Sequence, residues 1–582
     1  LYFLGGILME QEKIMNSLKD LLNIKFDKYG NKTAFIEKED NPKEFKNKSY
    51  SELKENINAL GTIMLKKFNL SGEKVAVIGE NSSRWYETYL AVVCGVGVIV
   101  PLDKELPGNE VLNLLKRSNS KCIVYSSRRK EVIESIKNKL PKDMIYIEMS
   151  KEKSDDESYS YNQLIEEGKE LVDTGEMEYI DAKIDREAFS ILLFTSGTTA
   201  ASKGVMLSHK NICADIYSCY DIVPMFGKYT CLSVLPLHHT LEFTLSYLFM
   251  TSVGGTIAIC EGLKYIVKNL QEIKPDFMVV VPELVEKMAA RIEKTIEKQG
   301  KTKLVNFMGG ITTGLSKVGI DLRRSVFKEV QKNLGGNLKY FFCGGAPLDK
   351  EVHKKMERFG FKFLQGYGLT ETAPLAAGNR LNDREPGTVG KAVYGDEIRI
   401  DLSANEDENS NVGEIIIRGD NVFMGYYENE SETKKALKKG WFYTGDLGYF
   451  DLKGNLVIAG RNKNVIVTPN GKNIFPEEIE QLVNKIPLVD ESMVYGKSEN
   501  GTGKDLVVSC KVTLNEEYIE EKYASKRPTD DELYSMIWED IKKVNKTMAP
   551  YKSIKKLEIK HEPFVKTTTM KIKRFEELKK DK

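Results

Sequence analysis

A hydroxyl-rich segment that ends in a lysine is the part of the sequence best suited to chemistry. Residues 194–209 read FTSGTTAASKGVMLSH and contain Thr195, Ser196, Gly197, Thr198, Thr199 and Lys203. Hydroxyl and backbone N–H groups on a tightly bent chain can surround a polyphosphate, and a lysine offsets part of its charge. The spacing is not that of the P-loop motif, because Gly204 directly follows the lysine. An ordinary hydrophilic turn is the alternative reading.

Two glycine-containing segments farther along the chain have groups that suit a nucleotide. Residues 340–347 read YFFCGGAP, an aromatic strand that breaks at Gly344, Gly345 and Ala346, where small side chains let a flat ring approach the backbone. Residues 365–372 read QGYGLTET and comprise Gln365, Gly366, Tyr367, Gly368, Leu369, Thr370, Glu371 and Thr372. In this segment Tyr367 can stack on a purine, Thr370 can donate to a phosphate and Glu371 can bind a divalent cation. A tight turn with a helix cap is the alternative.

Taken together, these segments resemble the adenylate-forming superfamily of acyl-CoA synthetases, peptide-synthetase adenylation domains and luciferases. Its signature loop reads approximately [ST]SGTTGxPKG, and this chain departs from that pattern at Ala200 and Ser202. The resemblance covers about residues 20 to 580. A long charged helix, which we expect around 291–303, and the segment 321–336 resemble the long-chain fatty acyl-CoA synthetase branch in particular.

The resemblance assigns roles to four residues outside the first segments. His239 falls on the histidine of a PLxH-like motif, near the carboxylate substrate and the adenylate. Asp446, in a Thr-Gly-Asp triplet, falls where the family holds the ribose hydroxyls, and Arg461 supplies a guanidinium for ribose or phosphate. Lys571 falls on the catalytic lysine of the closing motif, roughly KTxxGKIxR, although Met570 replaces its glycine. There are alternative readings for three of them: His239 as a core histidine, Asp446 as a turn-capping aspartate and Lys571 as a solvent-facing lysine.

The activity implied by the resemblance is the ATP-dependent activation of a fatty acid. The acid becomes an acyl-adenylate with release of pyrophosphate, and the acyl group then passes to the thiol of CoA. Lys203 and the hydroxyl loop would hold the β and γ phosphates, Glu371 would bind Mg²⁺, and Lys571 would stabilise charge between the carboxylate and the α-phosphate. Two alternatives remain: a ligase that loads an acyl carrier protein, and a catalytically silent adenylate-binding protein, which the changes at Ala200, Ser202 and Met570 motivate.

The elements that must position these residues alternate between strands and helices, which predicts a doubly wound parallel α/β lobe. Predicted helices lie at 11–29, 50–67, 83–91, 264–270, 282–299, 322–334, 476–485 and 530–546. Predicted strands lie at 33–36, 74–79, 191–194, 231–237, 491–495 and 505–512. Within about 387–460, short strands at 397–401, 413–418, 423–427, 441–444 and 455–459 predict a small barrel-like subdomain. We therefore expect a large domain over 1–462 and a small mobile α+β domain over 463–582, with Lys463 as the hinge residue.

Composition limits the classes of partner. The chain has 582 residues, 29% charged and 41% hydrophobic, with a net charge of +1, so no bulk charge favours nucleic acid. The eight cysteines show no paired metal-ligand spacing, and we expect reduced thiols in a cytoplasmic protein. The longest apolar run, 91–102, is too short to cross a bilayer. Basic runs at 552–556 and 571–574 leave room for peripheral membrane contact, and the sequence predicts no oligomeric state.

Overall fold

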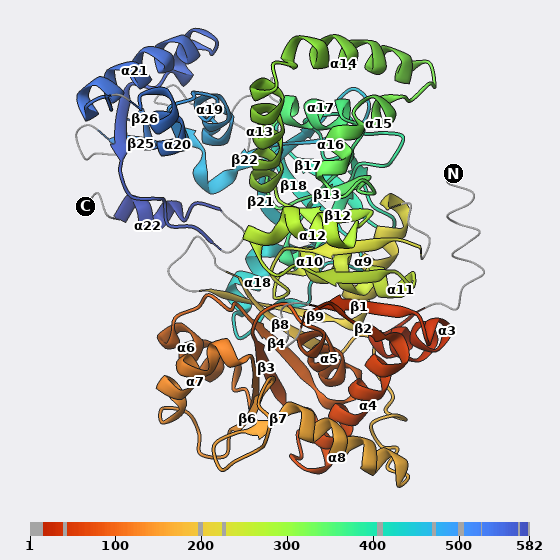
Figure 1. Ribbon diagram of the computed structural model, residues 1–582. Coiled ribbons are helices and arrows are strands. Elements are labelled where there is room, and N and C mark those ends of the chain that lie inside the picture. The colour runs from red at the N-terminus through yellow and green to blue at the C-terminus, as the bar shows by residue number, and fades with distance from the viewer. Residues whose placement is uncertain are drawn as a thin grey trace. The chain divides into compact units, whose positions relative to one another are not determined.

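The computed structural model describes residues 15–38, 44–195, 202–223, 228–403, 411–467, 473–498, 506–524, 526–567 and 571–579 (Figure 1). These residues form two compact units. The larger unit contains the described residues up to 195 together with 202–397 and 418–437. The smaller unit contains 398–417 and the described residues from 438 onwards.

The first sheet of the larger unit has the strand order β19-β9-β8-β4-β3-β5-β6-β7. Its strands are β3 (Lys74–Ile78), β4 (Val98–Leu102), β5 (Cys122–Tyr125), β6 (Ile145–Glu148), β7 (Tyr159–Ser160), β8 (Phe189–Thr195), β9 (Lys203–Ser208) and β19 (Gly425–Tyr426). Its helices are α4 (Tyr50–Lys66), α5 (Ser83–Ala91), α6 (Gly108–Ser118), α7 (Lys130–Lys137) and α8 (Tyr161–Asp173). Figure 1 shows α6 and α7 on one side of this sheet and α4, α5 and α8 on the other. Because helices cover both faces, β3, β4 and β5 are almost continuously apolar and buried.

The second sheet of the larger unit has the order β16-β15-β14-β13-β12-β10-β11-β1-β2, parallel in its middle and antiparallel at both edges. Its strands are β1 (Thr33–Glu37), β2 (Lys46–Ser49), β10 (Thr230–Ser233), β11 (Thr256–Ile259), β12 (Phe277–Val280), β13 (Tyr340–Cys343), β14 (Lys362–Gly368), β15 (Leu375–Gly378) and β16 (Lys391–Ala392). Its longer helices are α9 (His209–Ile222), α12 (Ile266–Ile273), α13 (Pro282–Lys298), α14 (Thr302–Lys317) and α17 (Lys350–Arg358). Strands and helices share one buried apolar cluster, which includes Met278, Phe341 and Met356.

Shorter elements complete the larger unit. They are α2 (Leu18–Asp20), α3 (Phe26–Tyr29), α10 (Thr240–Glu242), α11 (Met250–Ser252), α15 (Arg323–Val326), α16 (Lys328–Asn333) and α18 (Glu430–Ala436). π-helical turns lie at Leu21–Lys25, Val92–Val96 and Phe243–Phe249, and 3-10 turns at Ser127–Arg129, Leu263–Tyr265 and Thr370–Thr372.

The smaller unit contains two main sheets. One has the order β17-β18-β21-β20 with β22 beside β21, where the strands are β17 (Glu397–Asp401), β18 (Gly413–Arg418), β20 (Leu437–Lys438), β21 (Trp441–Phe450) and β22 (Leu456–Arg461). The other, β25-β26-β27, contains β25 (Val489–Ser498), β26 (Leu506–Leu514) and β27 (Lys556–Lys560). The remaining elements are β23 (Ile466–Val467), β24 (Asn473–Ile474), α19 (Pro476–Val483), α20 (Glu516–Lys522), α21 (Asp530–Lys546) and α22 (Arg574–Lys579), with 3-10 turns at Asn462–Asn464 and Pro550–Lys552. The division of the chain at 463 stays a prediction.

Three predictions of secondary structure were wrong in detail. The strand at 423–427 does not join the barrel-like strands, because β19 pairs with β9 through Gly425 to Met206 and Tyr426 to Val205. The single charged helix expected over 291–303 is divided between α13 and α14. Gly300 adopts φ +66 there, and Lys301 N–H donates to the Ile296 carbonyl, a hydrogen bond that closes the end of α13.

The helix predicted at 322–334 is likewise divided, into α15 and α16. Among the described residues, none of the helices has the length and apolar character needed to cross a membrane. Of the eight cysteines, seven are buried and Cys260 is half-buried.

Candidate functional site

The hydroxyl-rich segment connects two adjacent strands of the first sheet. Thr195 is the last residue of β8, Lys203 is the first of β9, and the two residues face each other in antiparallel register. Ser196, Gly197, Thr198 and Thr199 lie outside the described residues, and so does Ala200. The sheet therefore fixes both ends of the predicted phosphate loop within one strand spacing of each other.

Ser202, one of the departures from the family pattern, has a specific partner. Arg117 of α6 donates from Nη1 to Ser202 Oγ at 3.0 Å and from Nη2 to the Ser202 carbonyl at 2.9 Å. The same guanidinium lies over the Phe194 ring, 5.1 Å from its centroid. Arg117 thus holds the chain on both sides of the loop, because Phe194 precedes it and Ser202 follows it.

Lys203 and Glu371, which the sequence singled out separately, are linked through Tyr426. The Lys203 Nζ lies 4.5 Å from the centroid of the Tyr426 ring, and the Tyr426 hydroxyl donates to Glu371 Oε1 at 2.9 Å. Lys203 also forms a 2.6 Å ion pair with Glu432 of α18. Hydrogen bonds from Lys203 and Lys435 lower the pKa of Glu432 to about 2, so this carboxylate is ionised at neutral pH.

Sequence reasoning did not identify Tyr426 or Glu432. Tyr426 could have been identified only from the pairing of β19 with β9, which places it on the strand next to Lys203. That pairing joins segments more than two hundred residues apart in the chain, and no local pattern predicts it.

The segment that carries Glu371 is fixed through its backbone. The Phe423 N–H donates to the Glu371 carbonyl at 2.9 Å, and the Leu375 N–H donates to Asp215 Oδ1 at 3.0 Å. Asn421 Nδ2 donates to the Leu375 carbonyl at 2.6 Å. Burial raises the pKa of Asp215 well above its ordinary value. Phe423, Asp215 and Asn421 therefore fix the backbone of the loop at Glu371 and at Leu375.

The two glycine-containing segments have backbone that excludes larger side chains. Gly345 has φ +86, a conformation that favours glycine, and it is exposed together with Ala346, whereas Gly344 is buried. A Cβ at Gly368 would lie 1.7 Å from the Pro374 carbonyl oxygen. Local geometry therefore requires glycine at positions 345 and 368. The segments lie at the ends of the neighbouring parallel strands β13 and β14.

Gln365, Tyr367 and Thr370 occupy β14 and the turn after it. Gln365 is 2% exposed and Tyr367 is 9% exposed, so both side chains belong largely to the interior. Gly366 packs against the Phe342 ring, which approaches within 2.6 Å of where its Cβ would lie. Thr370 opens a 3-10 turn and is half-buried. The purine-stacking role of Tyr367 stays a prediction.

His239 lies at the start of α10, held by a network that the sequence did not reveal. The strand predicted over 231–237 ends at Ser233, and Asn81 holds the residues after it. Asn81 Nδ2 donates to the Leu235 carbonyl at 2.7 Å, and Asn81 Oδ1 accepts from the Leu237 N–H at 3.2 Å. Burial lowers the pKa of the neighbouring His238 to about 3, so that ring is neutral, and its centroid lies 4.0 Å from that of His239.

The smaller unit brings together the other three charged residues predicted from the sequence. Asp446 of β21 and Arg461 of β22 are direct cross-strand partners, and Arg461 Nε lies 2.7 Å from Asp446 Oδ1. Asp446 is 4% exposed. Lys571 is exposed by its side-chain surface, yet desolvation and the positive charge of Arg461 lower its pKa to about 8, while the Asp446 carboxylate opposes that shift. Lys463 lies in an exposed 3-10 turn directly after β22, and its hinge role stays a prediction.

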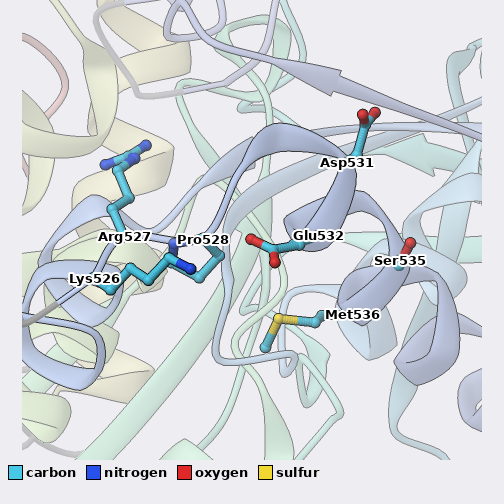
Figure 2. A pocket seen from close by; sticks show the side chains of 7 residues that line it. All are labelled: Lys526, Arg527, Pro528, Asp531, Glu532, Ser535 and Met536. Carbon is cyan, nitrogen blue, oxygen red and sulfur yellow. The ribbon is translucent and has the colours of Figure 1, made fainter.

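A separate open hollow lies at the start of α21 and contains none of the predicted site residues. It is lined by Lys526, Arg527, Pro528, Asp531, Glu532, Ser535 and Met536 (Figure 2). Figure 2 shows Lys526 and Arg527 on one side and Asp531 and Ser535 on the other. Arg527 forms an ion pair with Glu516, and Glu532 accepts from the Thr529 N–H as part of a helix cap. These charged groups therefore serve local structure.

Comparison with known proteins identifies the family. The AMP-binding enzyme family matches residues 23–427, and the AMP-binding enzyme C-terminal domain matches residues 463–580. The chain belongs to the AMP-binding enzyme family. The fold agrees: the anthranilate CoA ligase AuaEII in complex with anthranoyl-AMP superposes with a TM-score of 0.77 over 98% of each chain at 19% identity. The predicted doubly wound α/β lobe with a separate C-terminal α+β part is thus confirmed.

Relatives of this AMP-binding enzyme include ligases of two kinds. The long-chain-fatty-acid–CoA ligase FadD15 of Mycobacterium bovis is 31% identical over 407 residues, which are 66% of this chain and 66% of the relative. The long-chain-fatty-acid–[acyl-carrier-protein] ligase AEE15 of Arabidopsis thaliana is 25% identical over 561 residues, covering 84% of this chain and 76% of the relative. The match to FadD15 therefore leaves about a third of that ligase unpaired.

Proposed function

We propose that this AMP-binding enzyme activates a fatty acid with ATP and transfers the acyl group to CoA. A carboxylate oxygen of the acid attacks the α-phosphorus of ATP, the bond from that phosphorus to the bridging oxygen breaks, and pyrophosphate leaves. The sulfur of CoA then attacks the acyl carbon of the adenylate, the thiol proton is lost, and AMP leaves. The similarity to FadD15 supports a long-chain acid as the substrate class.

The observation that carries the proposal is the Lys203–Tyr426–Glu371 linkage. The cation of Lys203 lies over the Tyr426 ring, and the carboxylate of Glu371 accepts a hydrogen bond from the hydroxyl of the same residue. A polyphosphate with a bound divalent cation needs both charges at short range. An ordinary surface turn at 196–201 would require neither, so the linkage favours the phosphate-binding reading of that segment.

Glu371 is suited to bind Mg²⁺ that arrives with the substrate phosphates. Among the described residues, no three His, Cys, Asp or Glu side chains gather as a metal cage. Mg²⁺ is commonly held by one or two carboxylates plus substrate phosphates, which matches Glu371 as a single protein ligand. When bound, the ion would neutralise phosphate charge during the transfer. Tyr426 would orient the carboxylate, because its hydroxyl donates to one of the two oxygens.

In the smaller unit, Asp446 would accept hydrogen bonds from the ribose hydroxyls and Arg461 would orient that carboxylate. Lys571 would stabilise the negative charge that develops between the attacking carboxylate and the α-phosphate. Because its pKa is lowered, Lys571 loses its positive charge at a lower pH than an ordinary lysine does. Activity that needs this charge should therefore depend on pH.

The test of the proposal is acid-dependent exchange of labelled pyrophosphate into ATP, measured across a panel of carboxylic acids of increasing chain length. We expect exchange with at least one fatty acid and none without acid. Absence of exchange with every acid would favour the silent adenylate-binding protein. Product formation with CoA and with acyl carrier protein as acceptors then separates the two kinds of ligase found among the relatives.

Replacing Tyr426 with phenylalanine is expected to weaken the use of Mg²⁺. The variant keeps the ring beside Lys203 but removes the hydroxyl that donates to Glu371. Loss of one hydrogen bond to a charged group corresponds to roughly ten-fold, so we expect about ten-fold more Mg²⁺ for half-maximal exchange. The neighbouring Tyr427→Phe variant is the matched control, because its ring lies beside Phe189 instead. An unchanged Mg²⁺ requirement in Tyr426→Phe would remove Tyr426 from the site.

A further inference from the structure

Helix α14 exposes an apolar face. Leu304, Phe307 and Ile311 are 59%, 66% and 44% exposed and recur at helical spacing, so they lie on one side of the helix. The adjacent side contacts the core: Val305 and Met308 pack against the apolar cluster of the second sheet, and Thr312 is buried. Figure 1 shows α14 at the margin of the larger unit, near α13, α15 and α17.

The apolar exposure continues directly after the helix. Among the described residues, eighteen large apolar side chains are exposed, and seven of them fall within 304–326. We call this set the α14 surface; it consists of Leu304, Phe307, Ile311, Val318, Ile320, Leu322 and Val326. Single exposed apolar residues are normal in proteins, but three on one side of a helix, followed by four more in the next fifteen residues, are typical of an interaction surface.

The same stretch is basic. Residues 300–333 contain seven Lys or Arg and two Asp or Glu, a formal charge of +5, whereas the whole chain carries +1. Some of these groups are occupied: Arg323 pairs with Asp321, and Lys301 pairs with Glu329. Lys303 is exposed on α14, beside Leu304, and Lys328 is exposed at the start of α16, two residues after Val326. The excess positive charge would repel a second copy of the same surface and would attract an anionic one.

The helix is also intrinsically weak. Gly309, Gly310 and Gly314 lie within it, and each glycine in a helix interior costs about 1 kcal/mol relative to alanine. Gly309 is needed because a Cβ there would lie 2.3 Å from Arg358 Cδ, whereas Gly310 and Gly314 face open space. Lys301, which precedes the helix, makes no side-chain cap hydrogen bond. A contact along the exposed face would therefore add order to α14.

We propose that the α14 surface docks on an anionic lipid bilayer. A helix with Leu, Ile and Phe on one face and nearby lysines lies in the interfacial plane of a membrane, where its apolar residues enter the headgroup boundary and its lysines meet anionic lipids. This inference deepens the proposed function, because fatty acids partition into bilayers and docking would bring the enzyme to its substrate. Vesicle binding itself requires neither ATP nor acid, so it is tested independently of catalysis.

The experiment measures co-sedimentation of the full chain with vesicles, without ATP or acid. We expect binding to phosphatidylcholine vesicles that contain phosphatidylglycerol, weak binding to phosphatidylcholine alone, and a decrease as salt is raised. The triple variant Leu304→Ser, Phe307→Ser and Ile311→Ser should bind roughly ten-fold less tightly or worse. The matched control, Leu263→Ser with Tyr265→Ser, removes two apolar side chains that are 64% and 45% exposed elsewhere and should bind like wild type.

Two further measurements make the result decisive. Lys303→Glu with Lys328→Glu should weaken binding to the anionic vesicles only, and amide hydrogen exchange in α14 should slow when wild type is bound. Pyrophosphate exchange with a short, water-soluble acid should be equal in wild type and the triple variant, which shows that the variant is folded. Should that exchange be lost, an unchanged melting temperature establishes folding instead. The proposal is overturned if wild type ignores anionic vesicles, if the triple variant binds them like wild type, or if wild type is a dimer in solution that the triple substitution dissociates.

Discussion

Lys571→Ala is expected to reduce acid-dependent pyrophosphate exchange by about a hundred-fold to a thousand-fold, the range found when a group that stabilises transition-state charge is removed. Lys571 lies in the electrostatic field of Arg461 and Asp446, so it belongs to the same charged cluster as the predicted ribose-binding pair. Capture of the acyl group by CoA, started from synthetic acyl-adenylate, should survive in the variant. The measurement is exchange and thioester formation side by side.

The pH dependence gives this prediction a second readout. Because the pKa of Lys571 is lowered to about 8, the ammonium form is present below that pH and is lost as the pH rises through it. Exchange by wild type should therefore decline above about pH 8. Lys571→Arg keeps its charge at higher pH, since the guanidinium pKa exceeds 12, so its residual activity should lack that decline.

The control for both measurements is Lys573→Ala. Lys573 is two residues away and forms a surface ion pair with Glu576 at 3.2 Å, so its removal should change exchange little. Undiminished exchange in Lys571→Ala would exclude Lys571 from the adenylation step, whatever the pH profile shows.

Glu371→Ala is expected to raise the Mg²⁺ concentration needed for half-maximal exchange by more than about ten-fold and to lower the rate at saturating Mg²⁺. The physical reason is that Mg²⁺ would lose its single protein carboxylate and retain only phosphate and water ligands. The Tyr426 hydroxyl would also lose its acceptor, so the ring beside Lys203, the proposed phosphate-binding cation, would be less well fixed. A Mg²⁺ titration of exchange at fixed ATP checks this.

Glu430→Ala provides the comparison for Glu371→Ala. Glu430 lies on α18, which also carries Glu432, but its carboxylate is exposed and pairs only with Lys434 at 2.7 Å among the contacts of the described residues. Its removal changes net charge equally without touching the Lys203–Tyr426–Glu371 linkage. Matching Mg²⁺ curves for wild type and Glu371→Ala would contradict the metal-binding role.

Local pattern was sufficient for the regular elements near the site. Apolar periodicity identified β3, α4 and α21 closely, because a helix or a buried strand requires a fixed spacing of apolar residues. Periodicity did not predict the division of the helix expected over 291–303, because the conformation of one residue decides it. Gly300 ends α13 by adopting a positive φ, and α14 begins two residues later. The charged residues of 291–303 continue across the break and gave no sign of it.

One contact of the site, which the sequence analysis did not predict, joins two residues that the family resemblance had assigned separately. Asp446 and Arg461, fifteen residues apart, are direct partners in an antiparallel pair, as a hairpin of that length permits. This contact is local in the chain, because the two residues belong to consecutive strands. Asn81 and Asp215 hold the His239 and Glu371 segments through contacts across more than a hundred and fifty residues, and nothing in their surroundings in the chain marks them.

The sequence by itself determined which residue types are available for chemistry: the loop that ends at Lys203, the carboxylates Glu371 and Asp446, and Lys571. Motif order also determined the family, which the comparison confirmed. Only the tertiary structure decided that β19 lies against β9, so that Tyr426 joins Lys203 to Glu371, and that α14 turns an apolar face outwards. The reason is that side-chain chemistry is a local property of the chain. Strand pairing and burial depend on packing between distant segments.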